Sequence, residues 1–345
     1  MACDQGTLLY NGRYEIERVL GVGRFAITYQ AWDTRPPRQP VAIKTLNDEM
    51  RMGQDDLESR ERAQIFLHEA IQLGKCNHPH VVKVYDLFEE DRFPHVVMEF
   101  VAGDDLKQCG FRFGLAESLE VIQQIGSALD HVHSKNIIHR DVRPGNIRLR
   151  AGEANAVLID FGSVLSLQDE ISRSQSASHA GGFAAPEAYA RHGERGAWTD
   201  LYSLGAVLYW LVIREQPVTA TDRKLATRNG YADPLVFPSS LDASVVSLIE
   251  RAMRLKGHER PSSAALWLEQ RRKRSFYDRW MRWSRLRRIG TVIGTVLVML
   301  GTLLGTVIPL LGAVGGAMQG WESWFGSPVK EQPKEQPSTQ PVEME

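Results

Sequence analysis

The chain has 345 residues, of which 43% are hydrophobic and 24% are charged. These fractions are ordinary for a globular protein, so they exclude a chain that is disordered throughout and a collagen-like repeat. The formal net charge of -1 excludes a protein that binds nucleic acid through its overall charge, and we expect no nucleic-acid partner. Cys3, Cys76 and Cys109 fit no metal-binding spacing and no disulfide framework, which is typical of reduced thiols in a cytosolic domain.

Composition divides the chain into four parts. Residues 1–270 have the composition of a globular region. Residues 271–288 hold nine Lys or Arg and one Asp, a charge of +8, which leaves -9 for the rest because the total is -1. Residues 289–318 contain no ionisable side chain. Residues 319–345 are rich in Pro, Gln and Glu, so we expect a short disordered tail.

Hydrophobic patterns predict a strand-rich region followed by a helix-rich one. A helix is predicted at 54–75 and a turn around Pro36, Pro37 and Pro40. Short, often alternating segments predict strands at 14–19, 26–33, 41–46, 81–90 and 95–100. Helices are predicted at 115–133 and 200–213. The predicted fold class is therefore α+β.

The segment Gly21-Val-Gly23-Arg-Phe-Ala-Ile-Thr-Tyr29 lies between two predicted strands. Glycine lets backbone amides approach phosphate oxygens closely, so this segment is a candidate phosphate-binding loop. A plain hairpin turn explains the same residues equally well. A dinucleotide-binding fingerprint requires a helix after the glycines, and the strand that follows here excludes it.

A lysine and a glutamate form a second candidate pair. Val41-Ala-Ile-Lys44 places a lysine at the end of an apolar strand, and Glu69 lies 25 residues later on the predicted helix 54–75. A buried pair of these side chains would hold the ammonium at the α- and β-phosphates of a nucleotide. Two unrelated surface charges are the simpler interpretation of such a pair taken alone.

The most specific motifs lie near the middle of the chain. Ile138-His-Arg-Asp-Val-Arg-Pro-Gly-Asn-Ile147 places Asp141 five residues before Asn146 in a loop between apolar segments. Leu158-Ile-Asp-Phe-Gly162 then ends an apolar strand with Asp160. In one site, Asp141 would orient a hydroxyl and accept its proton, while Asn146 and Asp160 would bind Mg²⁺ through hard oxygen ligands.

In order and spacing, these motifs resemble the eukaryotic-type (Hanks-type) protein kinase family, most closely its bacterial serine/threonine branch. The resemblance covers about 14–268 and continues with Ala185-Pro-Glu187, Asp200-Leu-Tyr-Ser-Leu-Gly205 and Arg260-Pro261. It implies a two-lobed protein-kinase-like fold, with an N-lobe over about 14–100 and a C-lobe over about 101–268. It also implies phosphorylation of Ser and Thr hydroxyls on protein substrates, with ATP and Mg²⁺ as cofactors.

The resemblance also implies roles for individual residues. Asp141 would act as the base, and Asn146 and Asp160 would bind Mg²⁺. Lys44, paired with Glu69, and Arg143 would neutralise phosphate charge. The further nucleotide contacts that it implies are Gly21, Val22, Gly23, Thr28, Ala42, Glu99, Val101, Asp105 and Arg148.

Some positions depart from the family pattern. Ala26 replaces the third glycine of the loop, and Arg143 replaces the usual lysine. Arg148 stands where an aliphatic side chain usually packs under adenine. Alternation along the strand turns its neighbours the other way, so we expect the stem or guanidinium of Arg148 to stack on the base. These departures keep an alternative open, a membrane-tethered pseudokinase scaffold that recruits partners without turnover.

An apolar segment near the C-terminus predicts a membrane anchor. Residues 290–311 are 22 residues long and include twelve Val, Ile or Leu. As a helix they would span about 33 Å, against a hydrocarbon core of about 30 Å. Because basic residues precede the segment, we expect one span within 289–318 of the inner membrane, with the kinase domain in the cytoplasm. A buried soluble helix and a membrane hairpin are the alternatives.

Two features accompany this segment. Residues 271–288 form either an amphipathic helix on anionic lipid or a plain basic flank. Glycines also recur at alternating spacings of 4 and 7 residues, which places them on one side of a helix and favours a homodimer, although glycine is common in membrane helices. These glycines are Gly290, Gly294, Gly301, Gly305, Gly312 and Gly316.

Overall fold

A computed structural model describes residues 3–23, 25–51, 56–150, 155–161, 181–190 and 193–269. All of them belong to one compact unit. The basic segment 271–288, the predicted span 289–318 with its glycine stripe, and the tail 319–345 lie outside the described residues. Among the described residues, no helix is both long enough and apolar enough to cross a membrane.

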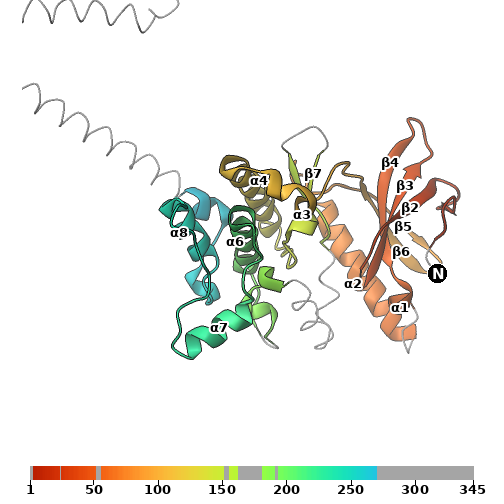
Figure 1. Ribbon diagram of the computed structural model, residues 1–345. Helices are drawn as coiled ribbons and strands as arrows, with labels where there is room; N and C mark the ends of the chain where they lie inside the picture. The colour runs from red at the N-terminus through yellow and green to blue at the C-terminus, as the bar shows by residue number, and fades with distance from the viewer. Residues whose placement is uncertain are drawn as a thin grey trace, which may run out of the picture. The chain divides into compact units, whose positions relative to one another are not determined.

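The N-terminal lobe is built on one antiparallel sheet (Figure 1). Its strands follow the order β1-β2-β3-β4-β6-β5. They are β1 (Leu8–Leu9), β2 (Tyr14–Val22), β3 (Ala26–Asp33), β4 (Gln39–Leu46), β5 (Val84–Glu90) and β6 (Phe93–Glu99). The five predicted strands are confirmed, whereas β1 was not predicted because two residues leave no periodic pattern. The strand predicted from 81 begins only at Val84, since Val81 forms an isolated bridge with Leu158 of the other lobe.

Apolar side chains cover both faces of this sheet. Ala42 and Val96 face a cluster that includes side chains of α2 (Asp56–Gly74), which confirms the helix predicted at 54–75. Ile43 and Val97, one position along each strand, belong to a separate cluster on the opposite face. This division follows from the two-residue period of a strand. The short helix α1 (Asp48–Arg51) precedes α2.

The C-terminal lobe is helical. Its helices are α3 (Leu106–Cys109), α4 (Leu115–His133), α6 (Ala197–Ile213), α7 (Ala220–Arg228) and α8 (Ala243–Ala252). The bounds predicted for α4 are confirmed, and α6 begins three residues before its predicted start. Most of α6 is buried, including Asp200, so it is a core helix with apolar residues on all sides.

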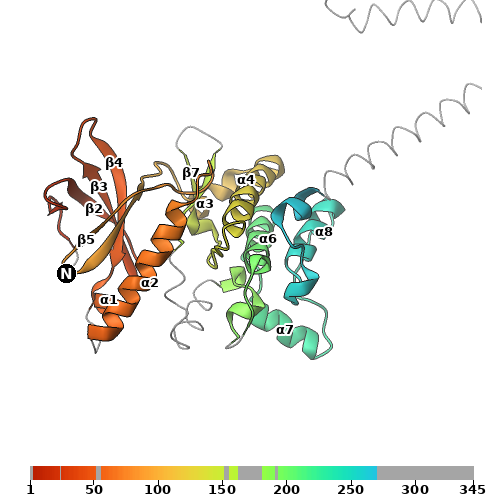
Figure 2. The same ribbon diagram turned by 180° about the vertical axis from the view of Figure 1, so that it is seen from behind.

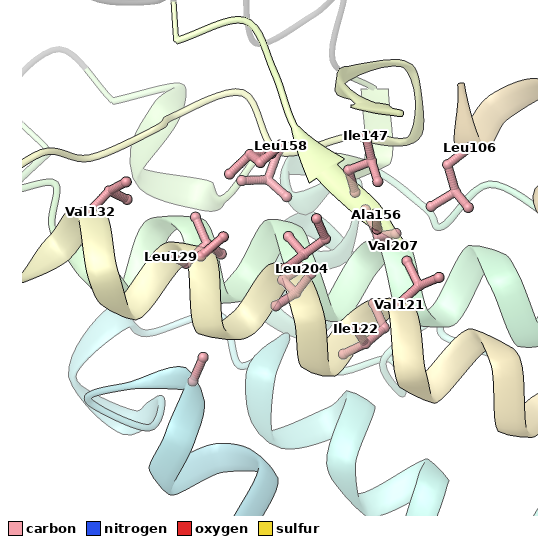
Figure 3. Packing of buried hydrophobic residues seen from close by; sticks show 14 of the residues in the cluster. Leu106, Val121, Ile122, Leu129, Val132, Ile147, Ala156, Leu158, Leu204 and Val207 are labelled. Carbon is pink, nitrogen blue, oxygen red and sulfur yellow. The ribbon is translucent and has the colours of Figure 1, made fainter. Parts of the chain in front are cut away.

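A short hairpin, β7 (Ile147–Leu149) and β8 (Ala156–Leu158), covers the helical core. Figure 3 shows Ile147, Ala156 and Leu158 of this hairpin beside apolar side chains of α4 and α6, such as Leu129 and Leu204. Because β8 ends at Leu158, the hairpin directs the residues that follow, including Asp160, towards the sheet of the N-terminal lobe.

The two lobes are joined through β8. Leu158 donates its backbone N–H to the carbonyl of His80 at 2.9 Å and accepts the N–H of Val82 at 3.0 Å. The His80 ring nitrogen Nδ1 lies 2.8 Å from the carbonyl oxygen of Ala156. The segment between α2 and β5 is therefore fixed to the C-lobe, and α2 lies between the sheet and the helical lobe in both views (Figures 1 and 2).

The contact between α6 and α8 depends on Gly205, because a Cβ at this position would lie 2.6 Å from the Cβ of Ala252. Replacing Gly205 with Ala should lower the free energy of unfolding in urea. Such overpacking costs about 1–3 kcal/mol, which exceeds the gain in helix propensity of about 1 kcal/mol. Gly74→Ala is the matched control, since its added Cβ would lie 3.9 Å from the Cβ of Val84. Unchanged or increased stability of Gly205→Ala would contradict the close packing.

Candidate active site

The loop between α4 and β7 is held by the buried carboxylate of Asp200. Its Oδ2 accepts the backbone N–H of His139 at 2.8 Å, and its Oδ1 accepts that of Arg140 at 2.7 Å. The ring nitrogen Nε2 of His133 lies 2.7 Å from Oδ2. Burial opposes ionisation of Asp200, but these hydrogen bonds outweigh it and lower the pKa of the carboxyl. Asp200 therefore fixes the backbone that carries the next residue, Asp141.

Asp141 and Asn146 meet at the end of this loop. The amide Nδ2 of Asn146 donates to the Asp141 carboxylate and to the Asp141 carbonyl, both at 2.8 Å. The Nε of Arg143 donates to the same carboxylate at 3.1 Å. Burial raises the pKa of Asp141, while the positive charge of Arg143 opposes that shift. Because its nitrogen is engaged by Asp141, Asn146 directs its amide oxygen elsewhere.

Asp160 brings the sheet and the loop together. Its carboxylate forms an ion pair with the ammonium of Lys44 on β4. The backbone N–H of Ile159 donates to the carbonyl of Asn146 at 2.9 Å, which places Asp160 beside the Asn146 segment. The positive charge of Lys44 lowers the pKa of Asp160. The structure thus brings together Lys44, Asp141, Asn146 and Asp160, as the motifs predict.

The expected ion pair between Lys44 and Glu69 is absent from this structure, because the ammonium contacts Asp160 instead. Glu69 still lies close enough to raise the pKa of Lys44, together with Asp160, against the effect of burial. Burial raises the pKa of Glu69 itself to about 8, although Lys44 and Arg140 lower it. Glu69 is therefore a largely protonated neighbour of the site at neutral pH.

The predicted nucleotide contacts occupy neighbouring positions on the sheet. Gly21 is paired with Thr28 across β2 and β3, and Thr28 is paired with Lys44 across β3 and β4. Gly23, next to exposed Val22, donates its N–H to the carbonyl of Ala26 at 2.8 Å and closes the hairpin. The glycine segment is therefore aligned with Lys44 across the sheet, two strands away from it.

The remaining predicted contacts lie where β6 leads into the C-lobe. Ala42 of β4 is paired with Met98 of β6, directly before Glu99, and Val101 is buried. The side chain of Glu99 forms an ion pair with Arg150. These residues form the edge that would face the base of a nucleotide.

Asp105 and Arg148 have partners that the sequence analysis did not predict. The Oδ1 of Asp105 accepts the backbone N–H of Gln108 at 2.9 Å and so caps α3. Arg148 donates Nη2 to the carbonyl of Gly103. Ile147 and Leu149 pack against the core, which confirms that alternation turns Arg148 to the other face.

An ion pair between Glu187 and Arg260 supports the C-lobe. Arg260 donates Nη1 and Nη2 to the two carboxylate oxygens of Glu187, at 2.7 and 3.0 Å. Thr199 donates its hydroxyl to Glu187 as well, at 2.9 Å. The Arg260 side chain is fully buried, so this bidentate pair fixes the segment before α6. Residues 162–180, which follow Asp160 and Phe161, lie outside the described part of the chain.

With this geometry in place, comparison with known proteins identifies the family. Residues 14–271 match the protein kinase domain family. The chain belongs to this family. It is 36% identical over 211 residues to serine/threonine-protein kinase PrkC of Bacillus subtilis, a match covering 60% of this chain and 31% of that protein. It is also 32% identical over 225 residues to serine/threonine-protein kinase B of Synechocystis, covering 61% and 38%. The matched region thus spans only about a third of these relatives.

Solved structures of the family share the fold. The structure titled PpkA-294 apo form is 25% identical, with a TM-score of 0.61, and the match covers 78% of this chain and 98% of that one. The kinase domain of Mycobacterium tuberculosis PknI, solved as a point mutant, is 23% identical with a TM-score of 0.58, covering 80% and 100%. The predicted two-lobed α+β protein kinase fold is confirmed.

The raised pKa of Glu69 predicts a pH-dependent effect on stability. The pKa of this carboxyl is about 8 in the folded state and about 4.3 in the unfolded chain. As the pH rises from about 4.3 to about 8, the unfolded chain loses this proton more readily than the folded state, so the free energy of unfolding falls. Glu69→Gln should therefore differ least from the wild type near about pH 4 and exceed its free energy of unfolding at about pH 8.5. Urea unfolding at both pH values measures this difference. Glu61→Gln, at an exposed position of α2, is the control, and a pH-independent effect of Glu69→Gln would contradict the assignment.

Proposed function

We propose that this chain is a serine/threonine protein kinase, which transfers the γ-phosphoryl group of MgATP to hydroxyl groups of protein substrates. The observation that carries the proposal is the convergence of Lys44, Asp141, Asn146 and Asp160 in a member of the protein kinase domain family. The names of the matched relatives, all serine/threonine-protein kinases, support the substrate class.

Asp141 is the group proposed to act on the substrate hydroxyl. Its carboxylate receives hydrogen bonds from Asn146 and Arg143, which fix its direction. A carboxylate fixed in this way orients the hydroxyl towards the phosphorus atom and accepts its proton as the new bond to phosphorus forms. Burial raises the pKa of Asp141 from its ordinary value, which makes the carboxylate a better proton acceptor.

The donor set fits a magnesium ion. Asn146 has its amide nitrogen on Asp141, so its oxygen is the atom left to face a cation. The Asp160 carboxylate, 46% exposed, contacts Lys44 through one oxygen. Both residues offer hard oxygen ligands, the kind that Mg²⁺ prefers. Asn146 and Asp160 would hold the ion, which neutralises charge on the phosphates when bound.

Positive charge from the protein completes the phosphate site. The ammonium of Lys44 contacts the Asp160 carboxylate, and the guanidinium of Arg143 contacts the Asp141 carboxylate. Such fixed charges stabilise a transferring phosphoryl group without reorganisation during the reaction. Gly21 and Gly23 would cover the phosphates from above, and Thr28, Ala42, Glu99 and Val101 would surround the base.

We further propose that residues 289–318 anchor the chain in the inner membrane with the kinase domain in the cytoplasm. The uncharged sequence of this segment and the basic residues before it support this topology. After alkaline extraction of membranes the chain should stay in the pellet, and its release would contradict the anchor.

Gly301→Leu with Gly305→Leu should weaken self-association in a membrane assay, and unchanged association would exclude the glycine stripe as a dimer interface.

The proposed activity is tested by transfer of radiolabelled phosphate from ATP. Asp141→Asn should reduce the rate at least about 100-fold, because the amide cannot accept the proton. Asp91→Asn is the matched control, since Asp91 lies in an exposed turn with φ of 51°, a conformation that Asn adopts readily. No transfer by the wild type, with ATP or partner binding retained, would favour the pseudokinase scaffold instead.

A further inference from the structure

Arg148 holds an unusual position for a cationic side chain. It lies on β7, and its neighbours Ile147 and Leu149 turn into the core. Its guanidinium reaches the chain that leads from β6 into α3, where Nη2 donates to the carbonyl of Gly103. The backbone lies against the same chain, because Leu149 donates its N–H to the carbonyl of Asp104 at 2.9 Å.

The guanidinium of Arg148 has unused hydrogen-bonding capacity. Its Nε is buried without a hydrogen-bond partner, and no carboxylate among the described residues forms an ion pair with Arg148. Arg150, just after the end of β7, pairs with Glu99. The Nε is closed off from the surface, whereas Nη1 is neither hydrogen-bonded nor fully buried among the described residues, so Nη1 is the donor that a ligand can reach.

The position of Gly103 tells which part of a nucleotide the guanidinium would meet. The base would lie along Glu99 and Val101. Gly103 is two residues further on, about 7 Å in extended chain, which is beyond the base and towards the sugar. The methylene stem of Arg148 would then pass beneath the base, and its head would lie beside the ribose.

Asp105, the other residue in this region, is already engaged. One oxygen of its carboxylate accepts the N–H of Gln108 as the cap of α3. The backbones of Asp105 and Arg148 form an isolated antiparallel bridge, so the two residues face the same space. Arg148 offers free donors at this place, whereas Asp105 offers a carboxylate that is partly used.

We propose that the guanidinium of Arg148 binds the ribose hydroxyls of the nucleotide and sets the preference for a ribonucleotide. The proposal rests on the proposed function, because it takes ATP to bind between the glycine segment and Glu99–Val101. In this assignment the hydroxyl oxygens accept N–H groups from a charged donor, which makes stronger hydrogen bonds than a neutral one.

Equilibrium binding of ATP, 2′-deoxy-ATP and 3′-deoxy-ATP with Mg²⁺ to the 345-residue chain tests the proposal. The wild type should bind at least one deoxynucleotide about 10-fold more weakly than ATP, the effect of one charge-assisted hydrogen bond. Arg148→Met keeps an unbranched stem and removes the donors, so the ratio should fall to within about 2-fold. Arg112→Met, at an exposed cation of the same lobe, should keep the wild-type ratio.

The outcomes separate the possible explanations. A brace that only supports the fold would change the affinity for all three nucleotides equally, and an unchanged ratio in Arg148→Met would overturn the proposal. Asp105→Asn keeps the α3 cap, and loss of the ratio in this variant alone would assign the ribose to Asp105. No binding of MgATP would contradict the proposed function and this inference together. Tight binding without dependence on the hydroxyls would contradict the inference alone.

Discussion

The buried carboxylate of Asp200 is the constraint on which the site depends. It lies on α6, which is packed on all sides, and it accepts the backbone N–H groups of His139 and Arg140 at the start of the loop that carries Asp141. Arg140 has a positive φ of 66°, a conformation that a residue with a side chain adopts only when its surroundings hold it. Asp200 thus transmits the rigidity of the helical core to a loop whose side chains must meet a substrate in a fixed orientation.

Charge balance is the second constraint. Three carboxylates, Glu69, Asp141 and Asp160, share the site with the ammonium of Lys44, and they respond differently. Asp160 takes the direct ion pair, so its pKa falls, whereas burial raises the pKa of Asp141 and Glu69. The Lys44 ammonium pairs directly with Asp160 and the Arg143 guanidinium with Asp141, whereas Glu69 has no ion pair among the described residues. A bound divalent cation would offset the negative charge of these carboxylates, and a bound nucleotide would draw the Lys44 ammonium towards its phosphates.

Sequence patterns predict those parts of this molecule that depend on local chemistry. The two-residue period locates the strands, and the spacing of Asp141, Asn146 and Asp160 predicts their convergence, because the loop and the following hairpin are short. The cap formed by Asp105 was also readable, since Asp followed three residues later by Gln is a helix-start pattern. The ligand contact implied for Asp105 stays a prediction, because the cap uses only one oxygen of its carboxylate.

Other features depend on distances between elements that no local pattern contains. Lys44 has two acidic neighbours from different elements, and only the tertiary arrangement decides that it pairs with Asp160 and not with Glu69. The bond from Arg148 to Gly103 depends on how closely β7 approaches the segment after β6. The late start of β5 follows from the bridge between Val81 and Leu158, which joins residues 77 positions apart in the chain.

A crystal structure of the chain with Mg²⁺ and a non-hydrolysable ATP analogue tests the central claim most directly. The account predicts that the oxygens of Asn146 and Asp160 bind the metal, that Lys44 contacts the phosphates, and that Asp141 faces the γ-phosphate. An analogue bound elsewhere, or these four side chains directed into separate regions around it, would contradict the account.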